Sequence, residues 1–513
     1  MAFSVTPRKN HCDNMSKKID LQSALTPADI KLTQKLLKEN EALKKEIKHL
    51  KSRKKYGLVW DSEKEPEKVV ELCKDKLPVL AEDQDREIET DKEKPVNVLI
   101  EGDNYHALSV LNYTHNEKID LIYIDPPYNT GSEGFMYNDK IVNREDSYRH
   151  SKWINFMDKR LRLAKNLLKK DGVILINIDD NEIAQLKLLC DEILGEDYFR
   201  NTVIWSYRTG GAPHKNDAFS RKHDYILLYS RSKEYFFNRF KEKIPYEKDF
   251  FGAKKDETGK FYADVNLRDV IEGDIILFKD GKEYKKISVK PVLNLSSERV
   301  EDFPTQKPIG LIKYFLEILS RPNATILDFF AGSGSTGHAV LDLNKENKDK
   351  RQFILCTNDE NNICTKVCYP RLKRNIVGFA KDNGKKVAGL GGNLKYFKTD
   401  FVDNATTDKN KKKLVDKSTE MLCLKEDCFE KVKSGKSFNV FKNPKEKYLG
   451  IIYDDDGIEG FKKEAKKLNK NFSVYVFSLD DSAREEEFED IKDLVELKPI
   501  PAVILNVYKR IFK

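Results

Sequence analysis

The residues best suited to chemistry begin with the tetrad Asp125-Pro126-Pro127-Tyr128, which directly follows the apolar run Ile119–Ile124. A short apolar run predicts a buried strand, so we expect the tetrad at the carboxyl edge of a parallel sheet, where α/β folds bind ligands. The Asp125 carboxylate and the Pro126 carbonyl can accept both N–H bonds of an exocyclic amine, which aims the nitrogen lone pair at an electrophile. Tyr128 offers a ring on which a base can stack, a contact worth about 1–3 kcal/mol. The alternative is that Asp-Pro-Pro is simply a turn.

A glycine-rich motif further along the chain predicts a second ligand site. It joins an apolar strand to a helix from about Thr336, as Ile326-Leu327-Asp328-Phe329-Phe330-Ala331-Gly332-Ser333-Gly334-Ser335-Thr336-Gly337. Gly332 and Gly334 allow the backbone to approach a ligand closely. The spacing Gly332-x-Gly334-x-x-Gly337 also completes the dinucleotide-binding pattern, so NAD is one candidate ligand. Asp328 argues against NAD, because its carboxylate would repel a pyrophosphate, whereas it can meet the positively charged amino-acid end of S-adenosylmethionine.

Acidic residues follow the next predicted strand, Phe353–Cys356. A carboxylate after that strand can bind a ribose diol. Glu360 is the first choice for this contact, and Asp359 is its rival.

Alternating strand and helix signals predict the sheet that positions these motifs. Several short apolar runs recur along the chain, and stretches with helical periodicity, 104–113 and 150–170, lie between the first three of them. The runs are Val96–Ile100, Ile119–Ile124, Val173–Ile178, Thr325–Phe329 and Phe353–Cys356. This alternation is typical of an α/β domain with a mostly parallel sheet.

Residues 201–300 differ in composition from the segments on either side. They hold 20 Lys and Arg against 15 Asp and Glu, together with 16 aromatic side chains. Strand-like pieces such as Asp224–Tyr229 and Asp274–Phe278 alternate there with glycine and charged turns. Basic and aromatic side chains in one segment suit phosphate contacts and base stacking.

The two ends of the chain carry no candidate catalytic motif. A predicted helix runs from Thr26 to about Lys55 with leucines at heptad spacing, and it packs either on its own domain or on a second copy. Residues 61–95 are interpreted as a surface connector and Asp408–Lys413 as a charged spacer. The final segment contains predicted strands and one amphipathic stretch, at Tyr448–Tyr453, Ser473–Phe477 and Ala502–Lys513.

Composition narrows the class of protein. The 513 residues carry 93 Lys and Arg against 85 Asp and Glu, a net charge of +8 that is compatible with nucleic acid without establishing it. The eight cysteines form no CxxC pair and have no histidine at zinc-ligand spacing, so we expect free thiols and no metal. The sequence has no apolar window of about 18 residues and no signal core, so we expect a cytoplasmic protein without a membrane contact.

Together, Asp125-Pro-Pro-Tyr128 and Phe330-x-Gly332-x-Gly334 resemble the amino-methyltransferases of DNA. The catalytic motif precedes the cofactor motif, and this circularly permuted order resembles the β group, in which a target-recognition region separates the two. The continuation Asn129-Thr130-Gly131 and the lead-in Leu99–Leu108 resemble the modification (Mod) subunits of type III restriction–modification systems. The resemblance covers roughly residues 55–513.

The resemblance implies a site-specific adenine-N6 methyltransferase that uses S-adenosylmethionine on a base flipped out of double-stranded DNA. It also implies a homodimer and a helicase-like restriction (Res) subunit as partner. Thr305 and Lys307 resemble a Thr-x-Lys-Pro motif that contacts the methionine part of the cofactor, and Asp103 resembles the acid near its adenine. The expected catalytic residues are Asp125, Pro126, Pro127 and Tyr128. The expected cofactor residues are Asp103, Thr305, Lys307, Asp328, Phe330, Gly332, Gly334, Thr336 and Glu360.

The expected fold is an α/β S-adenosylmethionine-dependent methyltransferase (Rossmann-like) core, circularly permuted, with an inserted target-recognition domain and a C-terminal α/β extension. Its parts are a helical and linker region that can make a dimer contact (1–95), the catalytic half of the core (96–200), the target-recognition domain (201–300), the cofactor half (301–407) and a C-terminal domain for dimer or restriction-subunit contact (408–513). The alternatives are an orphan or type II methyltransferase of the same group, a cytosine-N4 enzyme, and an inactive DNA-binding module. The intact motifs argue against the last of these.

Overall fold

The computed structural model describes residues 35–45, 67–130, 149–207, 219–249, 251–292, 306–380, 384, 386–404 and 407–512. The chain divides into two units, Met1–Leu58 and Val59–Lys513. In the first unit, residues 35–45 are helical, and Leu36 and Leu43 are more than half exposed. This agrees with the central part of the predicted helix, whose remainder lies outside the described residues.

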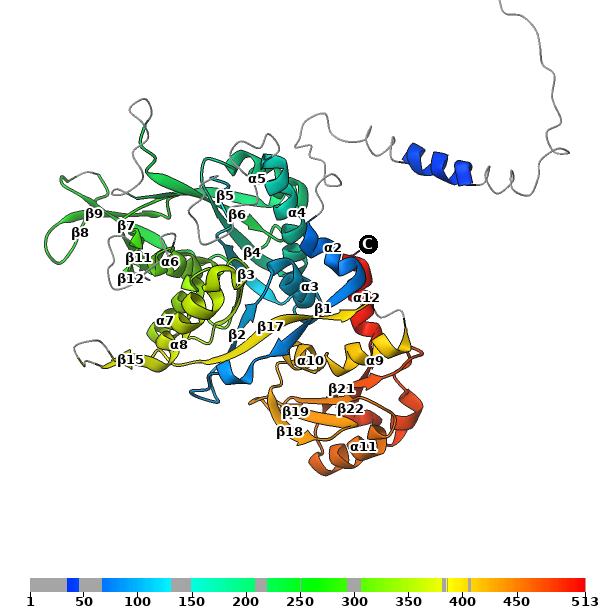
Figure 1. The fold of residues 1–513 in the computed structure, drawn as a ribbon. Helices are drawn as coiled ribbons and strands as arrows, with labels where there is room; N and C mark the ends of the chain where they lie inside the picture. Colours follow the sequence, from blue (N-terminus) through cyan, green and yellow to red (C-terminus); the bar gives the residue numbers. More distant parts are fainter. Residues whose placement is uncertain are drawn as a thin grey trace, which may run out of the picture. The chain divides into compact units, whose positions relative to one another are not determined.

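A ten-stranded sheet forms the centre of the second unit (Figure 1). In spatial order its strands are β1 (Lys76–Glu82), β17 (Asn393–Asp403), β2 (Val96–Glu101), β14 (Gln352–Thr357), β13 (Thr325–Asp328), β3 (Ile119–Ile124), β4 (Leu168–Ile178), β6 (His223–Ser230), β5 (Phe199–Ser206) and β10 (Val270–Ile271). The six strands from β17 to β4 are parallel to one another, so their carboxyl ends lie at one edge. The predicted parallel α/β fold is confirmed.

The strand that carries the glycine-rich motif lies in the middle of this sheet. β13 follows β3 and β4 in the chain, yet it lies between β14 and β3. The sheet therefore joins the two halves of the core that the sequence separates. The circularly permuted order relative to other families stays a prediction.

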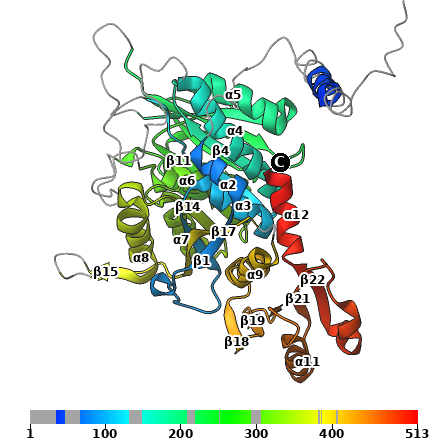
Figure 2. The same cartoon turned by 45° about the vertical axis from the view of Figure 1, so that its right-hand side comes forward.

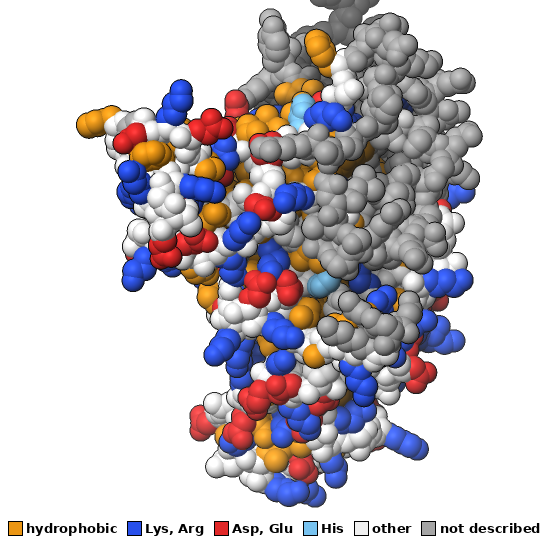
Figure 3. Space-filling view, turned by 90° about the vertical axis from the view of Figure 1, so that its left-hand side faces the viewer, with side chains coloured by type: hydrophobic (Ala, Val, Ile, Leu, Met, Phe, Trp, Pro, Cys, Tyr) orange, Lys and Arg blue, Asp and Glu red, His pale blue; other side chains and the backbone are white. Residues whose placement is uncertain are grey.

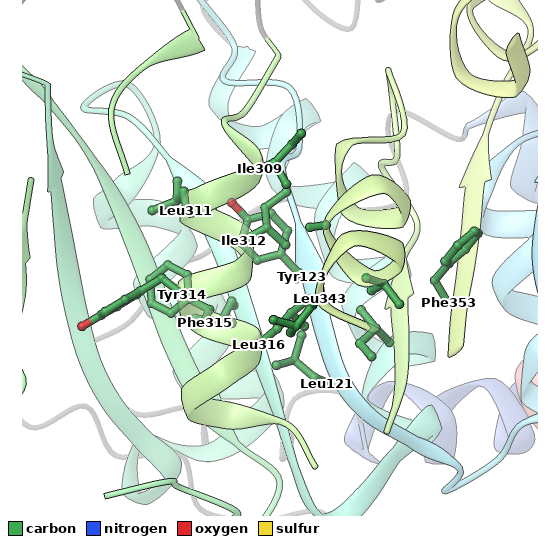
Figure 4. Close-up of a cluster of buried hydrophobic side chains, with 14 of the residues drawn as sticks. Leu121, Tyr123, Ile309, Leu311, Ile312, Tyr314, Phe315, Leu316, Leu343 and Phe353 are labelled. Carbon is green, nitrogen blue, oxygen red and sulfur yellow. The ribbon is translucent and has the colours of Figure 1, made fainter. Parts of the chain in front are cut away.

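Two groups of helices cover the sheet. One group is α3 (Asn104–Thr114), α4 (Arg149–Leu167) and α5 (Ile183–Cys190); the other is α6 (Ile309–Leu319), α7 (Ser335–Asn347) and α8 (Tyr369–Val377). Apolar side chains of α6, including Ile312 and Phe315, pack against Leu121 and Tyr123 of β3 (Figure 4). Burial of these apolar side chains is the main source of the free energy that holds the helices against the sheet.

Two predictions about the flanks of the core were wrong. Residues 61–95 are not only a connector, because β1 pairs antiparallel with β17 and α2 (Lys68–Asp75) precedes it. Leu77, Val79 and Leu80 of β1 are buried, but the charged residues around them mask this signal in the sequence. The predicted spacer Asp408–Lys413 begins α9 (Asp408–Asp416), whose first turn is capped by the Thr407 side chain.

A second sheet of five strands lies within the predicted target-recognition segment. Its spatial order is β12 (Lys282–Ser288), β11 (Asp274–Lys279), β7 (Lys241–Tyr246), β9 (Phe261–Asn266) and β8 (Lys254–Lys255). The predicted strands at 224–229 and 274–278 are both present, but the first belongs to the central sheet as part of β6. Residues 201–300 therefore contribute most of β5, together with β6 and β10, to the central sheet, and they also form a sheet of their own.

Basic and acidic side chains alternate over the face that includes this second sheet (Figure 3). Lys241 and Lys254 both pair with Asp264, and Lys243 pairs with Asp256. Phe251 is fully exposed and Tyr246 is partly exposed beside these pairs.

The C-terminal segment has a separate core but is joined to the central sheet. Its strands and main helices are β18 (Glu430–Ser434), β19 (Phe438–Lys442), β20 (Tyr448–Ile452), β21 (Phe472–Phe477), β22 (Val495–Ile500), α10 (Thr419–Glu426), α11 (Gly457–Leu468) and α12 (Ala502–Ile511). The predicted strands at 448–453 and 473–477 are confirmed. α10 and α12 pack on α3, in which every residue from Tyr105 to Thr114 is buried (Figures 1 and 2).

Two further observations concern the predicted absences. Seven of the eight cysteines lie in the described residues, and all seven are buried free thiols as expected. Among the residues that the structure describes, no helix is long and apolar enough to cross a membrane, and no cluster of three potential metal ligands occurs.

Candidate active site at the carboxyl edge of the sheet

The tetrad Asp125–Tyr128 and the glycine-rich motif meet because their strands are neighbours. Leu121 and Ile122 of β3 lie opposite Ile326 and Leu327 of β13 in parallel register. Asp125 and Asp328 directly follow or end these strands, so both carboxylates lie at the same edge. β14 and β2 continue the edge, which brings the residues before Glu360 and Asp103 into the same row.

Hydrogen bonds to Trp153 of α4 and to Glu182, the residue before α5, hold the tetrad Asp125–Tyr128 and the residue after it. Trp153, which is fully buried, donates an Nε1 hydrogen bond of 2.7 Å to the carbonyl of Pro127. Asn129 has a positive φ of 57° and donates to Glu182 Oε1 at 2.5 Å. A proline pair with two such anchors fixes the backbone of the tetrad.

Lys307 contacts the Asp125 carboxylate directly. Its Nζ lies 2.7 Å from both oxygens of Asp125 and 5.0 Å from the centre of the Tyr128 ring. The resemblance assigned Lys307 to the cofactor, whereas the structure places it against a predicted catalytic residue. Burial, followed by the negative charge of Asp125, raises the pKa of the Tyr128 hydroxyl well above its usual value, so this hydroxyl stays protonated.

Asp328 and the glycines after it form a turn suited to a ligand. Gly332 and Gly334 have φ values of 48° and 77°, a region that favours glycine. A Cβ on Gly334 would lie 3.0 Å from Cys368 Sγ, so the turn also packs too closely for a side chain. The Asp328 carboxylate accepts hydrogen bonds from Thr336 Oγ1 at 2.6 Å and from the Phe330 backbone N–H at 3.0 Å.

Burial raises the pKa of Asp328 to about 7, although the two hydrogen bonds oppose the shift. A buried carboxyl group with spare acceptor positions is stabilised in its charged form when a cation binds beside it. The turn therefore fits the ammonium end of S-adenosylmethionine better than a pyrophosphate, which favours that cofactor over NAD.

Asp103 and Asn104 connect β2 to this turn. Asp103 caps α3 by accepting the Tyr105 backbone N–H at 2.7 Å, and Asn104 Nδ2 donates to the Phe329 carbonyl at 3.0 Å. Arg160 binds both residues, with its Nε 2.5 Å from Asn104 Oδ1 and its Nη2 3.5 Å from Asp103 Oδ1. Two of the predicted cofactor segments, Asp103–Asn104 and the Asp328–Gly337 turn, are thus joined by a hydrogen bond.

The remaining predicted cofactor residues differ in their positions. Phe330 is buried, and its ring lies 5.9 Å from that of Phe156. Glu360 is exposed, whereas the Asp359 carboxylate accepts the Thr365 backbone N–H at 2.8 Å and is committed to the fold. This favours Glu360 over Asp359 as a ribose ligand. Thr305 lies outside the described residues.

Several residues that support the site were not identified in the sequence. Trp153 and Glu182 anchor the tetrad, and buried Arg371 donates to the hydroxyls of Ser333 and Ser335, each at 2.9 Å. No motif identifies these side chains, because each acts across the fold from a helix without distinctive local sequence. A tryptophan and charged residues inside otherwise apolar helical patterns were the only signals.

Residues 119–367 match the DNA methylase family N6_N4_Mtase. The matched residues include the tetrad, Lys307 and the glycine-rich turn.

Named relatives of the methylase domain include type III modification subunits. The chain is 31% identical over 358 residues to the StyLTI Mod subunit of Salmonella typhimurium, which covers 53% of this chain and 54% of that protein. It is 28% identical over 445 residues to the EcoPI Mod subunit of Escherichia phage P1, a match that covers 66% of this chain and 68% of that protein. It is also 29% identical over 377 residues to the type II methyltransferase M.KpnI of Klebsiella pneumoniae, covering 59% and 90%. The predicted similarity to type III Mod subunits is confirmed, and the match spans about half of the first of these relatives.

Proposed function

We propose that this chain is a site-specific DNA adenine-N6 methyltransferase that uses S-adenosylmethionine. The observation that carries the proposal is the pairing of β3 with β13, because it places the Asp125–Tyr128 tetrad beside the Asp328–Gly337 turn. Methyl transfer between two substrates requires such a shared edge, since the reacting atoms have to lie about 3–3.5 Å apart.

The residues of the edge have separate tasks in this proposal. Asp328 and the glycine turn hold the amino-acid end of the cofactor, Asp103 lies near its adenine, and Glu360 binds its ribose. When bound, the cofactor supplies an activated methyl group. Asp125 and the Pro126 carbonyl accept the two N–H bonds of the target amine, and Asp125 is the base closest to the proton that the amine releases.

The target base has to leave the DNA helix to reach this edge. Tyr128 then stacks on it, and its protonated hydroxyl adds no charge next to the base. The second sheet of residues 241–288 supplies exposed aromatic and basic side chains for target recognition. We assign the catalytic half to 96–200, recognition to 201–300, the cofactor half to 301–407, and dimer or restriction-subunit contact to 1–95 and 408–513.

Within this proposal, the chain is the modification subunit of a type III restriction–modification system and acts as a homodimer with a helicase-like restriction subunit. It rests on the named Mod subunits among the relatives. A type II methyltransferase without such a partner is the second candidate, because the similarity extends over 90% of M.KpnI. Co-purification of a large helicase-like subunit from the host separates the two candidates.

A methyl-transfer assay tests the catalytic assignment. The purified chain, host DNA from a strain lacking it, and labelled cofactor are expected to give N6-methyladenine, and modified-base sequencing then gives the recognition site. Asp125→Ala is expected to abolish transfer while calorimetry still detects cofactor binding. Label recovered in cytosine would replace adenine as the target, and transfer by Asp125→Ala at the wild-type rate would refute the catalytic role.

A further inference from the structure

The ammonium group of Lys307 lies where the target base has to bind. It contacts both oxygens of Asp125 at 2.7 Å and lies 5.0 Å from the centre of the Tyr128 ring. The side chain of Lys307 is only 10% exposed and that of Asp125 only 23%. The acceptor for the base amine and the ring on which the base stacks are therefore both covered by one lysine.

Separation of the Lys307 ammonium from Asp125 is energetically unfavourable unless another charged partner replaces it. Burial raises the pKa values of Asp224 on β6 and Asp328 on β13, and the negative charge of nearby Asp125 adds to both shifts. Removing the cation would leave a partly buried carboxylate without its counter-ion, which is strongly unfavourable. Arg221 is the other cation near Asp224, but it binds Asp179 at 2.5 Å.

Movement at this point is confined to the lysine side chain. Lys307 lies two residues before the first residue of α6, all but one of whose residues are buried. A Cβ on Gly310 would lie 1.8 Å from the Ser288 carbonyl oxygen, so the backbone here packs tightly against β12. Four rotatable methylene groups nevertheless allow the ammonium to reach a different anion from the same backbone position.

We propose that Lys307 blocks the base site until the cofactor binds, so that capture of a flipped base requires prior binding of cofactor. This inference rests on the proposed function, since the anion that draws Lys307 from Asp125 is the carboxylate of the cofactor's methionine part. Exchange of one carboxylate partner for another keeps the lysine paired. It also frees Asp125 and the Tyr128 ring at the moment when the methyl donor is in place.

Blocking of the base site by Lys307 has a direct consequence for the order of steps. A chain that binds DNA without cofactor leaves the target base stacked, because the base cannot displace a paired cation. A base is flipped only in a complex that can methylate it, so cofactor binding precedes base capture.

Base capture can be measured without any methyl transfer. A duplex with the recognition site, found by modified-base sequencing, carries 2-aminopurine in place of the target adenine, and its fluorescence rises when the base is unstacked. S-adenosylhomocysteine serves as the unreactive cofactor. For the wild-type chain we expect the rise only when S-adenosylhomocysteine is present.

Lys307→Met removes the charge but keeps the length of the side chain. We expect this variant to capture the base without cofactor and to bind S-adenosylhomocysteine about tenfold more weakly, the loss expected for one charged hydrogen bond. Lys307→Arg keeps a cation and is expected to retain the cofactor dependence. Lys345→Met, which removes an exposed lysine on α7, is the matched control and is expected to behave as wild type.

Two results would overturn the gate. One is equal base capture by the wild-type chain with and without cofactor, and the other is a Lys307→Met variant that folds, by its thermal transition, yet still needs cofactor for capture. Either result leaves the proposed function standing if the wild-type chain methylates DNA. Failure of methyl transfer by the wild-type chain refutes the proposed function instead.

Discussion

Cofactor affinity should depend on pH through Asp328. Burial raises the pKa of this carboxyl group to about 7 in the folded chain, from a usual value of 3.8. An ammonium ligand binds the ionised form, so cofactor affinity is full above the pKa and falls as the pH drops below it. With a pKa of about 7, the ionised fraction predicts that the Kd rises about eightfold between pH 7.5 and pH 6, or about 1.2 kcal/mol.

The same shift predicts an opposite effect on stability. A raised pKa means that the folded chain binds more protons than the unfolded chain between about pH 4 and pH 7. Ionisation of Asp328 therefore lowers the free energy of unfolding as the pH rises through this window, by up to about 4 kcal/mol. Asp328→Asn is expected to raise the thermal midpoint at pH 7.5, by less than this limit because the amide oxygen can keep only one of the hydrogen bonds from Thr336 and Phe330 in full.

Isothermal calorimetry at several pH values tests the binding prediction, with differential scanning calorimetry for stability. Asp328→Asn should bind cofactor weakly and without the eightfold pH dependence, an estimate that follows from the loss of one titrating group. Asp342→Asn, almost two turns beyond Thr336 on α7, should retain the wild-type slope. A wild-type Kd that is constant between pH 6 and pH 7.5, or an Asp328→Asn variant with the wild-type slope, would refute the reasoning.

Three further changes test the supports of the site. Trp153→Phe leaves the Pro127 carbonyl without its buried donor and is expected to lower the free energy of unfolding by about 1–3 kcal/mol in urea titrations, and to slow turnover at an unchanged cofactor Kd. Glu182→Ala should slow turnover in the same way, because Asn129 loses its acceptor, whereas Glu182→Gln keeps an acceptor oxygen and should restore most of the rate; equal rates for both variants would contradict a positioning role. Deletion of residues 502–512 uncovers α3 and removes the hydrogen bond of 2.5 Å from Tyr508 to the Pro78 carbonyl, so the thermal midpoint of the whole chain should fall, and an unchanged midpoint would show that the C-terminal helix does not support the core.

The local sequence determined the elements that carry the chemistry. Apolar runs such as Ile119–Ile124 predicted the strands, since a strand buried on both faces needs consecutive apolar residues. Glycines at 332 and 334 predicted the turn, because positive φ angles favour residues without a Cβ. Asp125–Tyr128 and Asp328 were identified from residue type and from their place after a strand, which are properties of a few consecutive residues.

Tertiary structure alone decided what surrounds these residues. Lys307 contacts Asp125 because α6, which Lys307 precedes, packs against β3, and no local pattern links two positions so far apart in the chain. Trp153 acts on the tetrad from α4 and Glu182 from the turn before α5, while β1 became an edge strand only through its pairing with β17. The spacing of apolar and polar residues along the chain determines each helix and strand, whereas burial and strand order depend on the free energy of the whole fold. The sequence therefore predicted the reacting groups, and the assembled sheet determined which residues contact them.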